Sequence, residues 1–297
     1  MKTVLRRRLL LGTAAVATTP PWWAQGQTPA PRVVASFSIL ADMAQALAPA
    51  GVQVTALVGP DADAHVYEPS PADGKRLAQA DLVLVNGLGF EGWIQRMVKV
   101  SGYRGPVVVA SQGITPRGGA QHGVDPHAWQ DLGLARHYIN NLVAAFTQRW
   151  PAHRDDISSR GTDYLARMTR LDAQVRAWLD LVPRAQRRVI TSHDAFGYFG
   201  AAYGVDFLAP QGWNTHSEPS AAAVARLIRQ IKQQRVRAVF VENISDPRLA
   251  ERMAREGGVR IGGRLYSDAL SKPGGPAATY LQLFEHNARS LAAALQA

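Results

Sequence analysis

The sequence predicts an α/β protein with two lobes, each containing a mostly parallel sheet, joined by a single long helix. Its 297 residues exceed the usual size of one hydrophobic core, which favours two lobes. Short β-branched runs alternate with helical patterns in two separate stretches of the chain. Between these stretches lies a long segment that has helical periodicity and no strand signals.

The first stretch contains four extended runs separated by helical patterns. The runs are 32–37, 52–58, 81–85 and 106–110, and the helical segments are 39–47, 71–79 and 91–100. Because the runs are apolar throughout, we expect a parallel sheet that is covered by helices on both faces. This stretch forms the predicted N-terminal α/β lobe, residues 31–150.

The same succession starts again after residue 183 and predicts a C-terminal α/β lobe over residues 184–297. Its extended runs are 188–191, 205–209, 238–242 and 259–265, and its helical segments are 195–203, 220–234, 247–256 and a last helix from about residue 276. The two halves are similar in pattern, although no exact internal repeat relates them.

The segment between the lobes, residues 151–183, predicts the linking helix. Six apolar residues recur in it at alternating spacings of four and three, which places them on one helix face: Tyr164, Met168, Leu171, Val175, Trp178 and Val182. Pro183 ends the pattern. One stiff helix between the lobes predicts only small motion on ligand binding.

The first residues predict export to the periplasm. Arg6–Arg8 precede the apolar stretch Leu9–Ala17, which is the pattern of a signal peptide and is too short for a membrane-spanning helix. We assign residues 1–30 to this signal, for which a twin-arginine route is open. The chain has no cysteine, so we expect neither disulfides nor a lipid anchor.

The amino-acid composition limits which partners and which metal ligands we expect. Without residues 1–30 the formal net charge falls from +10 to +6, and the arginines are scattered, which does not favour nucleic-acid binding. A chain without cysteine must bind metal through imidazole nitrogen and oxygen ligands.

Four polar residues follow predicted strands, where open α/β sheets bind their ligands. His65 and His127 belong to the first half, and His193 and Asp268 belong to the second. A lone histidine is more often a surface or core residue, and Asp268 alone could cap a helix or form a turn. Three histidines at strand ends, together with an aspartate, predict a divalent metal site in the cleft between the lobes.

The predicted ligand set favours zinc. Three imidazoles and one carboxylate suit tetrahedral Zn2+, whereas magnesium and calcium prefer oxygen ligands. His216 lies in a loop of the second half, so it or a water could complete the coordination, although loop packing is the commoner outcome. Glu242, at the end of another predicted strand, could accept a hydrogen bond from a ligand imidazole or cap the next helix.

The motifs around these residues resemble the metal-specific solute-binding proteins of ABC transporters, a family of zinc- and manganese-binding receptors. The resemblance covers essentially the whole chain after the signal and rests on six segments: Asp63–Pro69, Asn86–Trp93, Asp125–Trp129, His193–Phe199, Ser217–Ala221 and Tyr266–Leu270. It implies two lobes joined by a backbone helix, and metal bound by residues matching His65, His127, His193 and Asp268.

The resemblance also bears on the metal and the partners. A histidine at the position of His193 resembles zinc receptors, whereas manganese receptors typically have glutamate there, so Mn2+ is the second choice. The implied partner is an ABC permease in the inner membrane, and we expect a monomer. The long His- and acid-rich loop of many zinc-uptake members is missing, since only residues 118–124 occupy that stretch.

Two other classes of function remain as alternatives. A periplasmic zinc chaperone or sequestering protein would need the same metal site, so the sequence does not separate it from a transport receptor. A zinc hydrolase would need an open coordination position and a general base. The chain has no His-Glu-x-x-His motif, nucleophile elbow or Gly-rich phosphate loop, and we therefore expect no enzyme activity.

Overall fold

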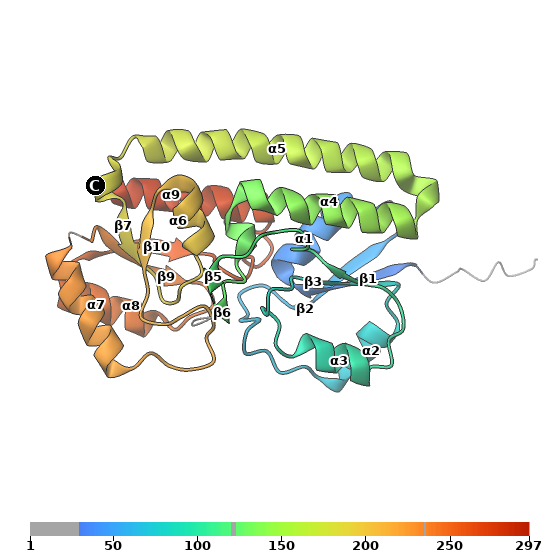
Figure 1. Ribbon diagram of the computed structural model, residues 1–297, viewed down its shortest axis with the longest axis horizontal. Coiled ribbons are helices and arrows are strands. Elements are labelled where there is room, and N and C mark those ends of the chain that lie inside the picture. Colours follow the sequence, from blue (N-terminus) through green and yellow to red (C-terminus); the bar gives the residue numbers. More distant parts are fainter. Residues whose placement is uncertain (1–29, 120–122, 235, 297) are drawn as a thin grey trace, which may run out of the picture.

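The computed structural model describes residues 30–119, 123–234 and 236–296, and the predicted signal segment lies almost entirely outside them (Figure 1). Two parallel four-stranded sheets form the two lobes, which confirms the predicted fold class. The first sheet has the order β2 (Gln53–Val58), β1 (Arg32–Phe37), β3 (Leu82–Val85), β4 (Val107–Val109). The second has the order β10 (Arg260–Leu265), β9 (Ala238–Glu242), β7 (Arg188–Ile190), β8 (Asp206–Leu208).

Helices cover both faces of each sheet. The N-terminal lobe contains α1 (Ser38–Leu47), α2 (Pro71–Ala78), α3 (Ile94–Val100) and α4 (Leu132–Arg149); the C-terminal lobe contains α6 (Gly197–Tyr203), α7 (Ala221–Gln233), α8 (Pro247–Gly257) and α9 (Tyr280–Gln296). In Figure 1, α2, α3, α7 and α8 lie below the sheets, and α4, α6 and α9 lie above them. β3 and β9, inside the sheets, are buried along their whole length, which explains their uninterrupted apolar runs, whereas the edge strands β2, β4 and β10 expose part of theirs.

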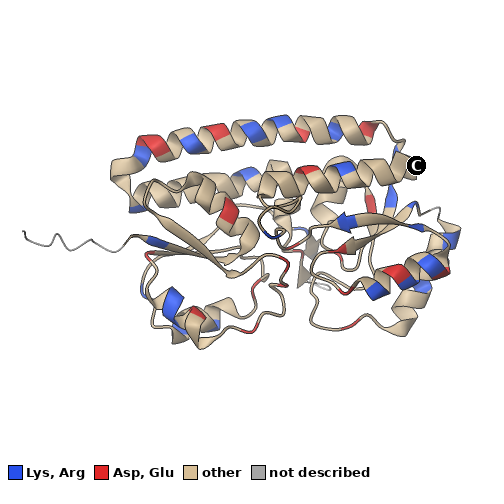
Figure 2. Cartoon of the chain, turned by 180° about the vertical axis from the view of Figure 1, so that it is seen from behind, with Lys and Arg blue, Asp and Glu red and all other residues tan. Residues whose placement is uncertain are grey.

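The helix α5 (Arg154–Asp180) runs along the top of both lobes, above α4 and α9 (Figure 1). Its buried residues recur every three or four positions: Ile157, Gly161, Tyr164, Met168, Leu171, Val175 and Leu179. Acidic and basic residues are interspersed along this helix, as the colours in Figure 2 show. The predicted domain boundaries, at residues 150 and 183, lie on either side of this helix. They remain predictions.

Two residues of the predicted buried face depart from the expectation. Val182 is buried but lies beyond the helix, and Trp178 is only half-buried, because the face shifts to Leu179 in the last turn. The Trp178 ring is covered by the Arg289 guanidinium of α9, 4.1 Å from the ring centre. A cation–π contact therefore covers part of the ring, in addition to its packing against the hydrophobic core.

The helix α4 and the short hairpin of β5 (Gly118–Gly119) and β6 (Gly123–Val124) were not predicted. Asp131 caps α4, since its side chain accepts the N–H of Gly133 at 2.7 Å. The close approach of α4 and α5 depends on Gly161, because a Cβ there would meet the Val143 Cγ2 atom at 2.6 Å. Within the described ranges, no helix has the length and apolarity needed to span a membrane.

One hydrophobic core extends through both lobes. It includes Val33 of β1, Met168 of α5, Tyr266 after β10 and Phe284 of α9. A second, smaller cluster lies between the C-terminal sheet and the helices α7 and α8. The continuous core ties both lobes to α5, so the lobes are coupled by packing as well as by the chain.

Candidate metal centre

The four predicted residues lie together between the lobes. His65 follows β2, His127 follows β4 and the β5–β6 hairpin, His193 follows β7, and Asp268 follows β10. All four are buried, and one donor atom from each lies within 4.8 Å of the others. Parallel strands bring them together because their carboxyl ends meet at the same edge of each sheet.

Four distances between donor atoms show how close together they lie. The Nε2 atoms of His65 and His127 are 3.3 Å apart, and His65 Nε2 is 3.3 Å from Asp268 Oδ2. Asp268 also lies 3.2 Å from His193 Nε2 through Oδ2 and 3.5 Å from His127 Nε2 through Oδ1. Both Asp268 oxygens and both His193 ring nitrogens lack a well-oriented hydrogen bond among the described residues. Buried polar atoms without partners are costly, and this donor set fits a transition-metal cation.

The charges in this cluster shift its pKa values in different directions. Burial lowers the pKa of His65. Burial also opposes the charged form of His127, but the nearby Asp268 and Asp125 carboxylates raise its pKa to about 9. Glu242 and Asp268 outweigh burial in the same way and raise the pKa of His193 well above its usual value. His127 and His193 in turn hold the pKa of the buried Asp268 well below its usual range.

Short polar turns fix the two histidines of the N-terminal lobe. The Asp63 carboxylate accepts the backbone N–H of His65 at 2.8 Å, and Asp125 accepts that of His127 at 3.0 Å. Asp125 Oδ1 is also 2.8 Å from His127 Nδ1, which directs Nε2 towards the cluster. An aspartate two residues before each histidine therefore sets its backbone, and for His127 also its ring.

Glu242 of β9 supports His193, which was one of its two predicted roles. Its Oε1 atom accepts the backbone N–H groups of Ser192 and His193 at 2.7 and 2.8 Å. Its Oε2 atom lies 2.7 Å from His193 Nδ1. This is a close ionic contact whose angles do not fit a hydrogen bond. Glu242 is completely buried, so its charge acts on His193 with little screening by water.

Asp268 is held by contacts from the opposite lobe. Trp129 Nε1 and Gln130 Nε2 both donate to the carbonyl oxygen of Ser267, at 2.9 and 2.8 Å. The hydroxyl of Tyr280, in α9, donates to the carbonyl oxygen of Trp129 at 2.5 Å. These bonds fix the backbone next to Asp268 across the boundary between the lobes, a role that the sequence did not indicate.

The loop after β3 supports the N-terminal half of the site. Glu91 accepts the N–H of Asn86 at 2.6 Å and the hydroxyl of Ser36 at 2.5 Å. The Asn86 amide then donates to the carbonyl of Pro126, directly before His127, at 3.0 Å. Phe90 of the same loop places its ring edge to face with His65, 4.7 Å between centres. The Asn86–Trp93 motif therefore supports the backbone before His127 and the ring of His65.

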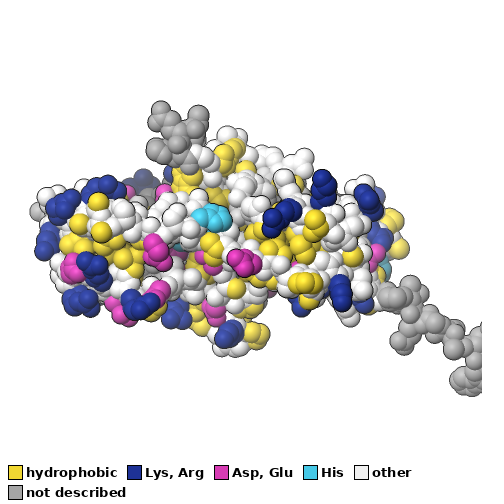
Figure 3. Space-filling view, turned by 90° about the horizontal axis from the view of Figure 1, so that it is seen from below, with side chains coloured by type: hydrophobic (Ala, Val, Ile, Leu, Met, Phe, Trp, Pro, Cys, Tyr) yellow, Lys and Arg dark blue, Asp and Glu magenta, His cyan; other side chains and the backbone are white. Residues whose placement is uncertain are grey.

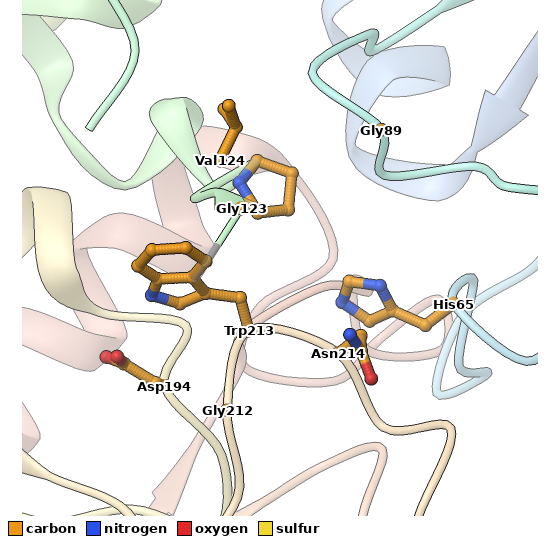
Figure 4. A pocket seen from close by; sticks show the side chains of 9 residues that line it. His65, Gly89, Gly123, Val124, Asp194, Gly212, Trp213 and Asn214 are labelled. Atoms are coloured by element: carbon orange, nitrogen blue, oxygen red, sulfur yellow. The ribbon is translucent and has the colours of Figure 1, made fainter. Parts of the chain in front are cut away.

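A pocket of about 470 Å³ lies on the solvent side of the cluster, and Figure 4 shows the residues that line it. His65 is the one cluster residue in its wall, and Figure 4 shows its ring beside Asn214, with Trp213 and Asp194 further away. On the face of the molecule seen in Figure 3, acidic side chains flank the middle of the surface. His216 is exposed and is not one of the four residues of the donor cluster.

Comparison with known proteins agrees with this architecture. Over residues 33–294 the chain matches the family described as zinc-uptake complex component A, periplasmic. The manganese-binding lipoprotein MntA of Bacillus subtilis is 32% identical, with 89% of this chain and 90% of MntA covered. The iron-binding protein YfeA of Yersinia pestis is 31% identical, with 98% and 93% covered. The solved structure of the periplasmic zinc-binding protein TroA of Treponema pallidum superposes with a TM-score of 0.86 at 31% identity, with 89% of this chain and 99% of TroA covered.

The two-lobed fold, the buried donor cluster and these relatives define a metal-binding substrate receptor of an ABC transporter, not an enzyme. The chain belongs to the family of zinc-uptake complex component A. Its cargo is a divalent metal ion, and the names of its relatives include zinc, manganese and iron.

Proposed function

We propose that the cargo is zinc and that His65, His127, His193 and Asp268 are its ligands. The observation that carries the proposal is a buried set of four protein donors of which three are imidazoles. Zinc prefers nitrogen-rich sites with four ligands. Manganese prefers oxygen-rich sites with octahedral geometry, which this donor set does not supply by itself.

The spacing of the donors supports the same metal. Four of the contacts between donor atoms measure 3.2–3.5 Å. In a tetrahedral site with zinc bonds of about 2.0 Å the donor atoms lie about 3.3 Å apart, which matches these four contacts. One donor atom from each of the four residues lies within 4.8 Å of the others.

A manganese receptor is the second candidate, because MntA, a manganese-binding relative, is 32% identical to this chain. The two candidates predict different outcomes for one experiment. Protein stripped of metal is titrated with zinc in the presence of excess manganese, and the bound metals are measured by mass spectrometry. The proposal expects zinc to displace manganese completely. Preferential retention of manganese would replace zinc with manganese as the cargo.

We also propose the location of the receptor and its transport partner. Export through residues 1–30 would bring it to the periplasm as a soluble monomer that delivers zinc to an ABC permease in the inner membrane. A periplasmic zinc chaperone would bind the same metal but would not need the importer. Deleting the receptor gene should therefore slow growth under zinc limitation as much as deleting the permease gene, and the double deletion should add nothing. An additive defect would favour the chaperone.

A further inference from the structure

The loop formed by residues 211–219, called here the 211–219 loop, is attached at its base to the segment that carries His193. Gln211 pairs with His193 in a parallel bridge, and the carbonyl of Gly212 accepts the N–H of Asp194 at 3.3 Å. Further along the loop, Trp213 and Asn214 line the pocket that His65 also lines (Figure 4).

The tip of this loop is bonded to the opposite lobe. The hydroxyl of Thr215 donates to Asp63 Oδ2 at 2.5 Å. The other oxygen of the same carboxylate, Oδ1, accepts the backbone N–H of His65 at 2.8 Å. One side chain therefore joins the loop of the C-terminal lobe to the backbone of the first predicted ligand.

His65 is the member of the cluster through which this connection would act on the metal. His127, His193 and Asp268 are completely buried, whereas His65 is 3% exposed and forms part of the pocket wall. A bound ion leaving towards the pocket would have to pass the His65 side of the cluster. The hydrogen bonds that fix the His65 backbone therefore affect how fast this route opens.

We propose that Thr215 is an interlobe latch: its bond to Asp63 holds the 211–219 loop over the pocket, positions His65 and slows the release of metal. A hydrogen bond to a carboxylate that is partly shielded from water is stronger than one between neutral groups. Losing it would let the loop and the Asp63–His65 turn separate more often, so the effect falls on dissociation more than on association. Only the kinetic test of this proposal rests on the proposed zinc function.

The test compares Thr215→Val, which keeps the shape of the side chain but removes the hydroxyl, with Thr215→Ser, which keeps the hydroxyl. Zinc-loaded full chain is mixed with excess chelator, and the release rate is followed by stopped flow. We expect release from Thr215→Val to be about ten-fold faster, because hydrogen bonds to charged groups are among the stronger ones. The association rate should stay unchanged, and Thr215→Ser should behave as wild type.

Hydrogen exchange in the metal-free chain supplies a readout that does not depend on zinc. Amides of the 211–219 loop should exchange faster in Thr215→Val than in wild type or Thr215→Ser. Equal exchange in all three chains overturns the latch, as does zinc release that is unchanged or that Thr215→Ser fails to restore. If the wild type binds no zinc, the proposed function is wrong, and exchange alone then decides on the latch.

Discussion

The carboxylates around the donor cluster favour the protonated forms of two of its three histidines. The pKa of His127 is raised to about 9, and that of His193 is raised well above its usual value, mainly because Asp268, Asp125 and Glu242 outweigh the effect of burial. Burial lowers the pKa of His65, which favours its neutral form. A bound metal ion would then replace the protons on His127 and His193.

Metal binding should therefore release about two protons at pH 7, because an imidazole must be neutral to bind a metal. The sign follows from the raised pKa values: protons compete less as the pH rises, so affinity increases from pH 7 towards 9. Calorimetric titrations with zinc in two buffers of different ionisation enthalpy measure the number of protons. A heat that does not depend on the buffer would contradict this assignment.

The carboxylate of Glu242 is expected to set which nitrogen of His193 is free to bind metal. In Glu242→Gln, the new amide would donate to Nδ1, which places the ring proton on Nε2, the atom that faces the cluster. We expect zinc affinity to fall about 10–100-fold, as is typical when a ligand's partner is lost. Competition with a fluorescent chelator measures it, and Glu256→Gln, at an exposed position, serves as the control.

The ligand residues were predictable because each one follows an apolar strand run in a short polar motif. The residues that hold them were mostly not predictable. Trp129 and Gln130 contact Ser267, 138 and 137 positions further along the chain, and Asn86 contacts Pro126 at a separation of 40. Such contacts depend on how the lobes pack, and a local pattern in one sequence does not encode them.

At the scale of elements, α5 holds the two lobes through one buried face. Met168 lies near the middle of this helix and is 1% exposed. Met168→Ala should leave a cavity and lower the free energy of unfolding by about 2–5 kcal/mol. Arg170→Ala, at an exposed position of the same helix, should change it by less than about 0.5 kcal/mol. Urea unfolding followed by circular dichroism compares the two, and equal effects would contradict the packing described for this face.

The strands were predictable because β-branched apolar runs of three to six residues mark buried parallel strands. The helix α4 was missed although its signal was present: Ile139, Leu142 and Phe146 recur at helical spacing and are buried. The β5–β6 hairpin has two residues in each strand, too few for any periodic pattern to show.

At the scale of the whole molecule, the lobes are joined by more than a linker. The hydrophobic core is continuous from β1 through α5 to α9. Polar bonds also cross between the lobes, such as Leu270 N to Ser38 Oγ at 3.0 Å and Thr215 to Asp63. This connection limits rotation of one lobe against the other. Metal binding would then act on local loops, including the 211–219 loop.

We therefore expect the radius of gyration of the free and zinc-loaded protein to differ by less than about 1 Å, as in binding to a preorganised site. Small-angle X-ray scattering on both forms measures it, with the Thr215→Val chain as a further comparison. A closure of tens of degrees between the lobes would contradict the account of α5 as a stiff connection.

The metal content of the purified chain shows whether the four buried donor residues bind zinc. Protein isolated from the periplasm is analysed by plasma mass spectrometry for the wild type, His193→Ala and His216→Ala, the last being an exposed histidine outside the cluster. We expect one zinc per chain in the wild type and in His216→Ala, and essentially none in His193→Ala, whose affinity should fall by more than about 100-fold. Wild-type protein without bound metal, or His193→Ala protein that still holds one zinc per chain, would contradict the assignment of this site.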